Sequence, residues 1–204
     1  MSLSAAERFF SLLALLAGAG AIGLVVLRLV PGGRPTLAML APASRWLAFL
    51  VTGTATAGSL YFSEIQEFTP CRLCWFQRIF MFSLAVVTFV GAVRRDPGVR
   101  RYAIPLAGLG ICVSIYHYLV EWYPQLETDS CAISVPCSVP WYREFGFVTL
   151  SFSAMCGFAA VLALMTVVPS DDASTPYSDP DDEDLDVDTT SAHASSAPGI
   201  DAAH

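Results

Sequence analysis

The chain has 204 residues, of which 54% are hydrophobic and only 14% are charged, and its formal net charge is −7. This composition excludes an ordinary soluble domain and favours a membrane protein. Every basic residue is arginine, and ten of the 18 acidic residues follow Pro169, where arginine is absent. Because no part of the chain has a strongly basic balance, we expect no nucleic-acid partner.

Five apolar stretches are long enough to cross a bilayer, which takes about 20 helical residues. They cover residues 9–30, 46–62, 75–93, 102–122 and 146–168. Pro and Gly interrupt residues 31–45, which are predicted to form a loop, and a charged turn follows the third stretch. The first stretch exceeds the usual apolar region of a secretory signal, so it is predicted to be a retained helix. The predicted fold class is an all-α polytopic membrane protein.

Small residues of the first two spans, such as Gly18, Gly20, Gly23 and Gly58, are expected to serve close helix packing rather than a site. The segment after Pro169 is rich in Asp, Ser, Ala and Pro and nearly lacks large apolar side chains. Such a segment cannot bury enough surface to order itself, so residues 169–204 are predicted to be a disordered acidic tail.

Arginine placement sets the predicted orientation, since positively charged loops are retained on the cytoplasmic side. Segments 28–45 and 94–101 together hold seven arginines, whereas the opposite side holds Arg8, Arg72 and Arg143. The amino terminus is therefore predicted to lie outside and the acidic tail in the cytoplasm. Four of the six cysteines then lie at or beyond the outer face, where disulfides persist. These four are Cys71, Cys74, Cys131 and Cys137.

Cys71 and Cys74 form a Cys-x-x-Cys pair at the predicted start of the third span, after Thr69 as N-cap and Pro70 as first helical residue. Thiolate stabilisation at a helix start makes such a pair reactive. Arg78 lies on the same helical face, where it is expected to favour the Cys74 thiolate and to bind an oxygen of an electron acceptor. Gln77 is expected to donate a hydrogen bond to the same electron acceptor. Snorkelling of Arg78 to the outer headgroups is the alternative.

Cys131 and Cys137 form a second pair, in a proline-rich loop between the fourth and fifth spans. A mobile loop can pass a disulfide from a soluble protein to the first pair by thiol exchange, so a relay is predicted; a simple staple of the loop is the alternative. Zinc is disfavoured because Cys-x5-Cys is a poor half-site, and covalent haem because Trp75 replaces the required His. No metal is predicted. Cys112 and Cys156 lie within spans and are expected to act as small apolar residues.

The string Cys-x-Leu-Cys-Trp-x-Gln-Arg, together with residues 58–65, 68 and 70–81, resembles the DsbB family of disulfide bond formation proteins, especially its BdbC-type branch. Residues 144–150 resemble the start of that branch's last span. The resemblance implies a four-helix redox bundle at 46–168. The extra amino-terminal helix with its cytoplasmic linker (1–45) and the tail are additions.

The resemblance also implies the activity, which is reoxidation of a soluble or anchored thioredoxin-like thiol oxidase, of the DsbA kind, with electrons passing to a membrane quinone of the menaquinone or ubiquinone type. The partner would attack Cys131, Cys137 would exchange with Cys71, and Cys74 would meet the quinone beside Arg78. His117 resembles a histidine near the same site. Two rivals stay open: an enzyme like vitamin K epoxide reductase that runs in the other direction, and a non-catalytic scaffold stapled by two disulfides.

Overall fold

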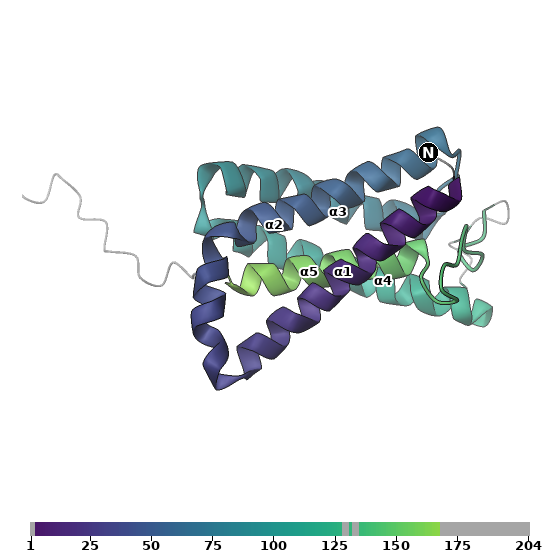
Figure 1. The fold of residues 1–204 in the computed structure, drawn as a ribbon. Helices are drawn as coiled ribbons and strands as arrows, with labels where there is room; N and C mark the ends of the chain where they lie inside the picture. Colours follow the sequence, from purple (N-terminus) through teal and green to yellow (C-terminus); the bar gives the residue numbers. More distant parts are fainter. Residues whose placement is uncertain (1–2, 128–130, 132–134, 168–204) are drawn as a thin grey trace, which may run out of the picture. The chain divides into compact units, whose positions relative to one another are not determined.

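A computed structural model describes residues 3–127, 131 and 135–167. These residues form five long helices and no regular strand, with one isolated bridge between Glu144 and Val148. All five helical segments are long and apolar enough to cross a membrane. They are α1 (Leu3–Leu29), α2 (Arg34–Leu60), α3 (Arg72–Arg94), α4 (Arg100–Trp122) and α5 (Leu150–Val167), shown in Figure 1. The all-α polytopic prediction is confirmed; the predicted tail lies outside the described residues.

Helix α5 packs against α1, α2 and α4, and α3 packs against α2 and α4. The main apolar core lies among α2, α3, α4 and α5 and includes the fully buried Phe158. Gly110 of α4 makes room for that ring, since a Cβ on Gly110 would lie 2.3 Å from it. Helix α1 crosses over α5 (Figure 1) and contacts it through Ala21 and through Gly18, which faces Cys156. Cys156 is buried, as expected, whereas Cys112 is exposed on the bundle surface.

The prediction of a loop at residues 31–45 is wrong over most of that segment. Pro31–Gly33 forms one 3-10 turn, and α2 begins at Arg34. Pro35 falls in the first turn of α2, where its missing N–H has no helical partner to lose. Pro42 lies inside the helix. Figure 1 shows α2 bending near its start, which is the usual effect of an interior proline.

Two other helix starts differ from prediction. The N-cap of α3 is Cys71 rather than Thr69, because Cys71 has an extended backbone and its sulfur accepts the Cys74 N–H at 3.3 Å. Helix α5 starts at Leu150 rather than at residue 146. Positive φ angles at Phe145 and Gly146 turn the chain there, and Thr149 then accepts a hydrogen bond from the first turn of α5.

One end of the bundle, which we call the cysteine end, holds the starts of α1, α3 and α5 and the ends of α2 and α4. Phe10 of α1 contacts Phe62, which follows α2, and Phe62 in turn contacts Tyr142, which precedes α5. Nε of Arg8 lies 3.9 Å from Oε1 of Glu144, which makes an ion pair. These contacts tie the extra amino-terminal helix to the loop that carries the second cysteine pair.

Candidate active site

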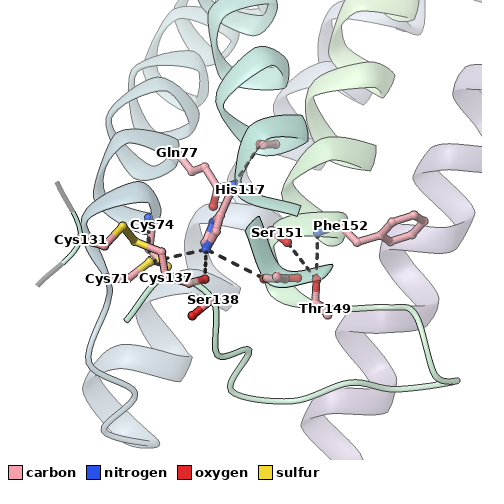
Figure 2. A network of polar contacts seen from close by, with 12 residues as sticks. Cys71, Cys74, Gln77, His117, Cys131, Cys137, Ser138, Thr149, Ser151 and Phe152 are labelled. Atoms are coloured by element: carbon pink, nitrogen blue, oxygen red, sulfur yellow. Dashed lines mark hydrogen bonds and ion pairs between the residues drawn. A yellow bond between two sulfur atoms is a disulfide. The ribbon is translucent and has the colours of Figure 1, made fainter. Parts of the chain in front are cut away.

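Cys71 and Cys74 lie at the cysteine end with their sulfurs 2.8 Å apart (Figure 2). Cys71 is the N-cap of α3, and Cys74 is the third residue of that helix. The Cys71 sulfur therefore receives the Cys74 backbone N–H and faces the positive end of the helix dipole. This placement stabilises a thiolate at Cys71, whereas the sequence predicted it at Cys74.

The pKa of Cys71 is lowered to about 5 from an ordinary value of 9.0. The main cause is a hydrogen bond from the Cys74 thiol, and the His117 ring and the Cys74 backbone N–H contribute in the same direction, against the opposing effect of burial. A pKa below 7 favours the thiolate form of Cys71, and the thiolate is the form that takes part in disulfide exchange.

Cys131 and Cys137 form a disulfide, with their Cα atoms 5.9 Å apart. Cys137 is almost fully buried and packs in one cluster with Cys71 and Val120, while Cys131 is more exposed at the edge of that cluster. Glu127 anchors this part of the loop: one carboxylate oxygen accepts the Cys137 N–H at 2.6 Å, and the other accepts the Ser138 hydroxyl at 2.7 Å. These bonds, with the one from Ser138 dominant, hold the pKa of Glu127 below its usual value. The structure thus brings the two pairs together.

His117 projects from α4 toward the group formed by the two cysteine pairs (Figure 2). Its Nε2 lies 3.2 Å from the Cys137 carbonyl oxygen and 3.6 Å from the Cys71 sulfur. A carbonyl can only accept, so Nε2 carries a proton when it bonds to Cys137. Glu121, one turn further along α4 and also buried, places Oε1 3.9 Å from the same nitrogen. Glu121 was missed by the sequence reasoning, although its i, i+4 spacing from His117 was a usable signal.

Cys71, Cys74 and His117 each offer a ligand atom, and these atoms lie within 4.8 Å of one another. This trio could coordinate a thiophilic cation. A structural zinc site, however, usually has four protein ligands in tetrahedral geometry. The second pair does not complete the set, because its sulfurs are bonded to each other. The donor set therefore suits thiol chemistry better than resident zinc.

A cavity of about 600 Å³ begins at Cys74, Gln77 and Arg78 and continues between α1, α2, α3 and α5. Its lining is predominantly apolar. The Arg78 guanidinium donates from Nε to the Ser59 hydroxyl and from Nη2 to the Ser59 carbonyl, both at 2.9 Å. It also lies 5.4 Å from the centre of the Trp75 ring. Ser59 is a second residue whose role the sequence reasoning missed.

Within the described residues, Nη1 of Arg78 has no hydrogen-bond acceptor, and the residue lines the cavity. Gln77 lines the same cavity, and its Nε2 donates to the Ser114 hydroxyl at 3.2 Å. His117 does not line this cavity; it lines a small cleft with Cys71 and Cys74. Cys74 borders both spaces. The predicted residues therefore divide into a cluster of cysteines with His117 and an apolar cavity, which meet at Cys74. Because we propose below that the first exchanges thiols and the second binds an electron acceptor, we call them the thiol-exchange cluster and the acceptor cavity.

Comparison with known proteins identifies the family of the chain. The family model described as disulfide bond formation protein DsbB matches residues 41–168. The chain belongs to the DsbB family. Its match includes α3, α4 and α5 and all but the first residues of α2, whereas α1 lies outside it.

Curated relatives carry names of the same kind. The chain is 40% identical over 115 residues to the probable disulfide formation protein C 1 of Bacillus anthracis, covering 56% of this chain and 83% of that one. It is 38% identical over 124 residues to disulfide bond formation protein C of Bacillus subtilis, with 60% and 88% covered. It is also 42% identical over 131 residues to a probable disulfide formation protein of Deinococcus radiodurans, with 59% and 85% covered. No solved structure gives a significant match. The family resemblance inferred from the sequence is confirmed, and with it a role as an oxidoreductase in disulfide bond formation.

Proposed function

We propose that this protein is a membrane thiol oxidase that reoxidises a thioredoxin-like dithiol partner and passes the electrons to a membrane quinone. One observation carries the proposal: a loop disulfide, a helix-capping dithiol and an apolar cavity form one continuous path through Cys137, Cys71 and Cys74. The cavity is lined by Arg78, whose Nη1 has no acceptor among the described residues. Membership of the DsbB family supports the thiol-oxidase part of it.

The first step is attack by a partner thiolate on Cys131. Cys131 is more exposed than the buried Cys137, so an incoming protein reaches it more easily. The attack breaks the Cys131–Cys137 bond and forms a mixed disulfide. The second partner thiol then releases Cys131. The partner leaves with a disulfide, and both loop cysteines are thiols, so two electrons and two protons have entered the loop.

The second step transfers the same two electrons to the inner pair. The Cys137 thiolate attacks Cys71, which breaks the Cys71–Cys74 bond and releases Cys74 as a thiol. Cys131 then attacks Cys137 in this mixed disulfide and releases Cys71. The structure corresponds to the products, with the loop pair bonded and the inner sulfurs separate at 2.8 Å. Stabilising the Cys71 thiolate favours this direction, because a disulfide is a stronger oxidant when its reduced form is stabilised.

His117 assists by holding a proton at Nε2. From there it donates toward the Cys71 sulfur and the Cys137 carbonyl, so it stabilises the thiolate that leaves and orients the loop that exchanges with it. Glu121 lies close enough to stabilise positive charge on the ring. In this role His117 serves the thiols, and its contact with the quinone would be indirect.

The acceptor site fits a quinone by its donor set, because an apolar wall suits the ring and Nη1 of Arg78 can donate to a ring oxygen. A quinone bound there would take two electrons from Cys71 and Cys74, one proton from the Cys74 thiol and a second proton from solvent, because Cys71 is already deprotonated, and it would leave as the quinol. Cys74 borders the cavity and would supply the sulfur nearest the acceptor, while Ser59 holds Arg78 in place. Loss of the electrons restores the Cys71–Cys74 disulfide.

The orientation proposed for these steps places the cysteine end outside the cytoplasm and the carboxyl-terminal tail inside. The excess of arginine in segments 28–45 and 94–101 supports it. These segments contain the end of α1 with the first part of α2, and the end of α3 with the start of α4, so both are at the end opposite to the cysteines.

The test is anaerobic turnover of the purified protein with a reduced thioredoxin-like thiol oxidase and a quinone, monitored by quinone bleaching. Wild-type protein should bleach the quinone in proportion to the disulfide formed in the partner. Cys71→Ser and Cys74→Ser should each abolish bleaching, while Cys112→Ser, on the exposed surface, should retain it. No bleaching by the wild type would favour a scaffold, and net reduction of the partner by added quinol would favour the vitamin K epoxide reductase-like direction.

A further inference from the structure

Helix α1 is absent from the family match, yet it forms one wall of the acceptor cavity. Its cavity-lining residues recur every three or four positions, which is the spacing of one helix face. This stripe consists of Phe10, Leu13, Ala14, Ala17, Gly20, Ala21, Leu24 and Leu27. Leu16 and Gly23 flank it and line the cavity as well. The added helix therefore presents a continuous apolar face to the space that ends at Arg78.

Two glycines of this wall leave open space rather than allowing helix contact. A Cβ on Gly20 or Gly23 would meet no atom within 4 Å, whereas one on Gly58 would lie 2.6 Å from Phe10. The expectation that Gly20 and Gly23 serve close packing is thus wrong, and that for Gly58 is right. Because both glycines line the cavity, their missing side chains enlarge it.

The cavity is long as well as apolar. From Phe10 to Leu27 the helix advances about 25 Å, which is most of the roughly 30 Å hydrocarbon thickness of a bilayer. Leu40 of α2 and Leu164 of α5 line it too, and both lie far along their helices from the cysteine end. The polar groups Cys74, Gln77 and Arg78 come from the first two turns of α3, which is at the cysteine end.

We propose that α1 is a binding wall for the prenyl tail of the quinone, so that the added helix contributes to substrate selection. This inference rests on the proposed function. The occupant must combine a polar, reducible head with one long apolar chain, because the cavity joins a redox-active sulfur and an arginine at one end to an apolar channel along α1. A prenylated quinone has both parts, and a phospholipid acyl chain lacks a head that fits beside Cys74.

The test fills the space beside α1 without disturbing the head site. Gly20→Leu and Gly23→Leu add a side chain where the structure has room, and leucine is a better helix former than glycine. Gly108→Leu is the matched control, because a Cβ there also meets nothing within 4 Å but Gly108 does not line the cavity. Binding is measured by quenching of tryptophan fluorescence, since Trp141 lines the cavity and Trp75 contacts Arg78.

The probes are a prenylated naphthoquinone and menadione, which has the same ring without the prenyl tail, with the corresponding benzoquinone pair in parallel. Gly20→Leu and Gly23→Leu should weaken binding of the prenylated quinone by about tenfold or more, as expected for extra bulk in an apolar pocket. Menadione binding, and thiol exchange at the Cys131–Cys137 pair, should stay within about twofold of wild type. Gly108→Leu should change neither.

Several outcomes would overturn the inference. Unchanged binding of the prenylated quinone would show that its tail lies elsewhere or that another lipid occupies the channel. Equal loss for both probes would show a general disturbance of the head site. If the wild type turns over quinone in either of these cases, the proposed function survives while the role of α1 is rejected. If the wild type binds no quinone of either series, both fail.

Discussion

The pKa of Cys71 offers a direct test of the thiol-exchange cluster. We predict that in the reduced protein the thiol of Cys71 titrates with a midpoint near pH 5, and that His117→Phe raises that midpoint by about one unit. A hydrogen bond to a charged group contributes about 1.5–3 kcal/mol, and one pKa unit corresponds to about 1.4 kcal/mol. The 3.6 Å distance from Nε2 to sulfur argues for the lower end of that range.

The midpoint, rather than the rate at neutral pH, is the informative quantity. A rise from about 5 to about 6 would lower the thiolate fraction at pH 7 only from about 99% to about 91%. The same unit raises the intrinsic nucleophilicity of the thiolate roughly 2.5- to 3-fold, so the observed rate at pH 7 would rise slightly rather than fall. A rate measured at one pH would therefore not report the change in pKa.

The assay is alkylation of the reduced protein by iodoacetamide across a pH series, with each cysteine quantified by peptide mass spectrometry. Burial of Cys71 slows labelling at every pH but leaves the midpoint unaffected. Tyr118→Phe is the control, because the Tyr118 hydroxyl bonds to the Phe147 carbonyl and not to a thiol. A wild-type midpoint above pH 8, or one that His117→Phe leaves in place, would refute the assignment of the thiolate to Cys71.

Two further predictions concern the acceptor site and the core. In steady-state kinetics, Arg78→Ala should raise the KM for quinone at least about tenfold while leaving the rate of partner exchange at Cys131 within about twofold of wild type. Ser59→Ala removes one of the two hydrogen bonds that hold the guanidinium, so it should raise the KM less. Equal losses in both steps would indicate a folding defect instead. Gly110→Ala should lower the free energy of unfolding by about 1–3 kcal/mol, because the added Cβ would lie 2.3 Å from Phe158. Gly108→Ala, where a Cβ meets nothing within 4 Å, should be neutral or stabilising. Equal stability of the two variants in detergent denaturation would contradict this explanation.

The sequence could predict features that depend on composition and local spacing. Five apolar stretches predict five spanning helices because the bilayer sets their length, and all five are present in the described residues. That the sulfurs of Cys71 and Cys74 lie close together follows from their spacing of three residues in the sequence. What spacing could not predict is which sulfur becomes the thiolate, since that depends on Cys71 serving as N-cap and on His117 reaching it from another helix.

Proline and glycine show a second limit of local reasoning. Pro35 and Pro42 were expected to keep residues 31–45 out of a helix, but the first falls in the opening turn and the second is accommodated by a bend. A proline restricts its own φ and removes one N–H; whether the helix continues depends on contacts that the packed bundle provides. In an isolated peptide, which lacks these contacts, the same prolines would end the helix more readily.

Glycine has two opposite effects within the single helix α1. Gly18 lies against Cys156, where an added Cβ would come within 3.0 Å of the sulfur, so its small size allows α1 to approach α5. Gly20 and Gly23 face open space, so there the small size leaves room for something outside the chain. A pattern of small residues in a membrane helix is therefore compatible with close helix approach and with open space beside the helix, and the distance to the neighbouring atoms distinguishes the two.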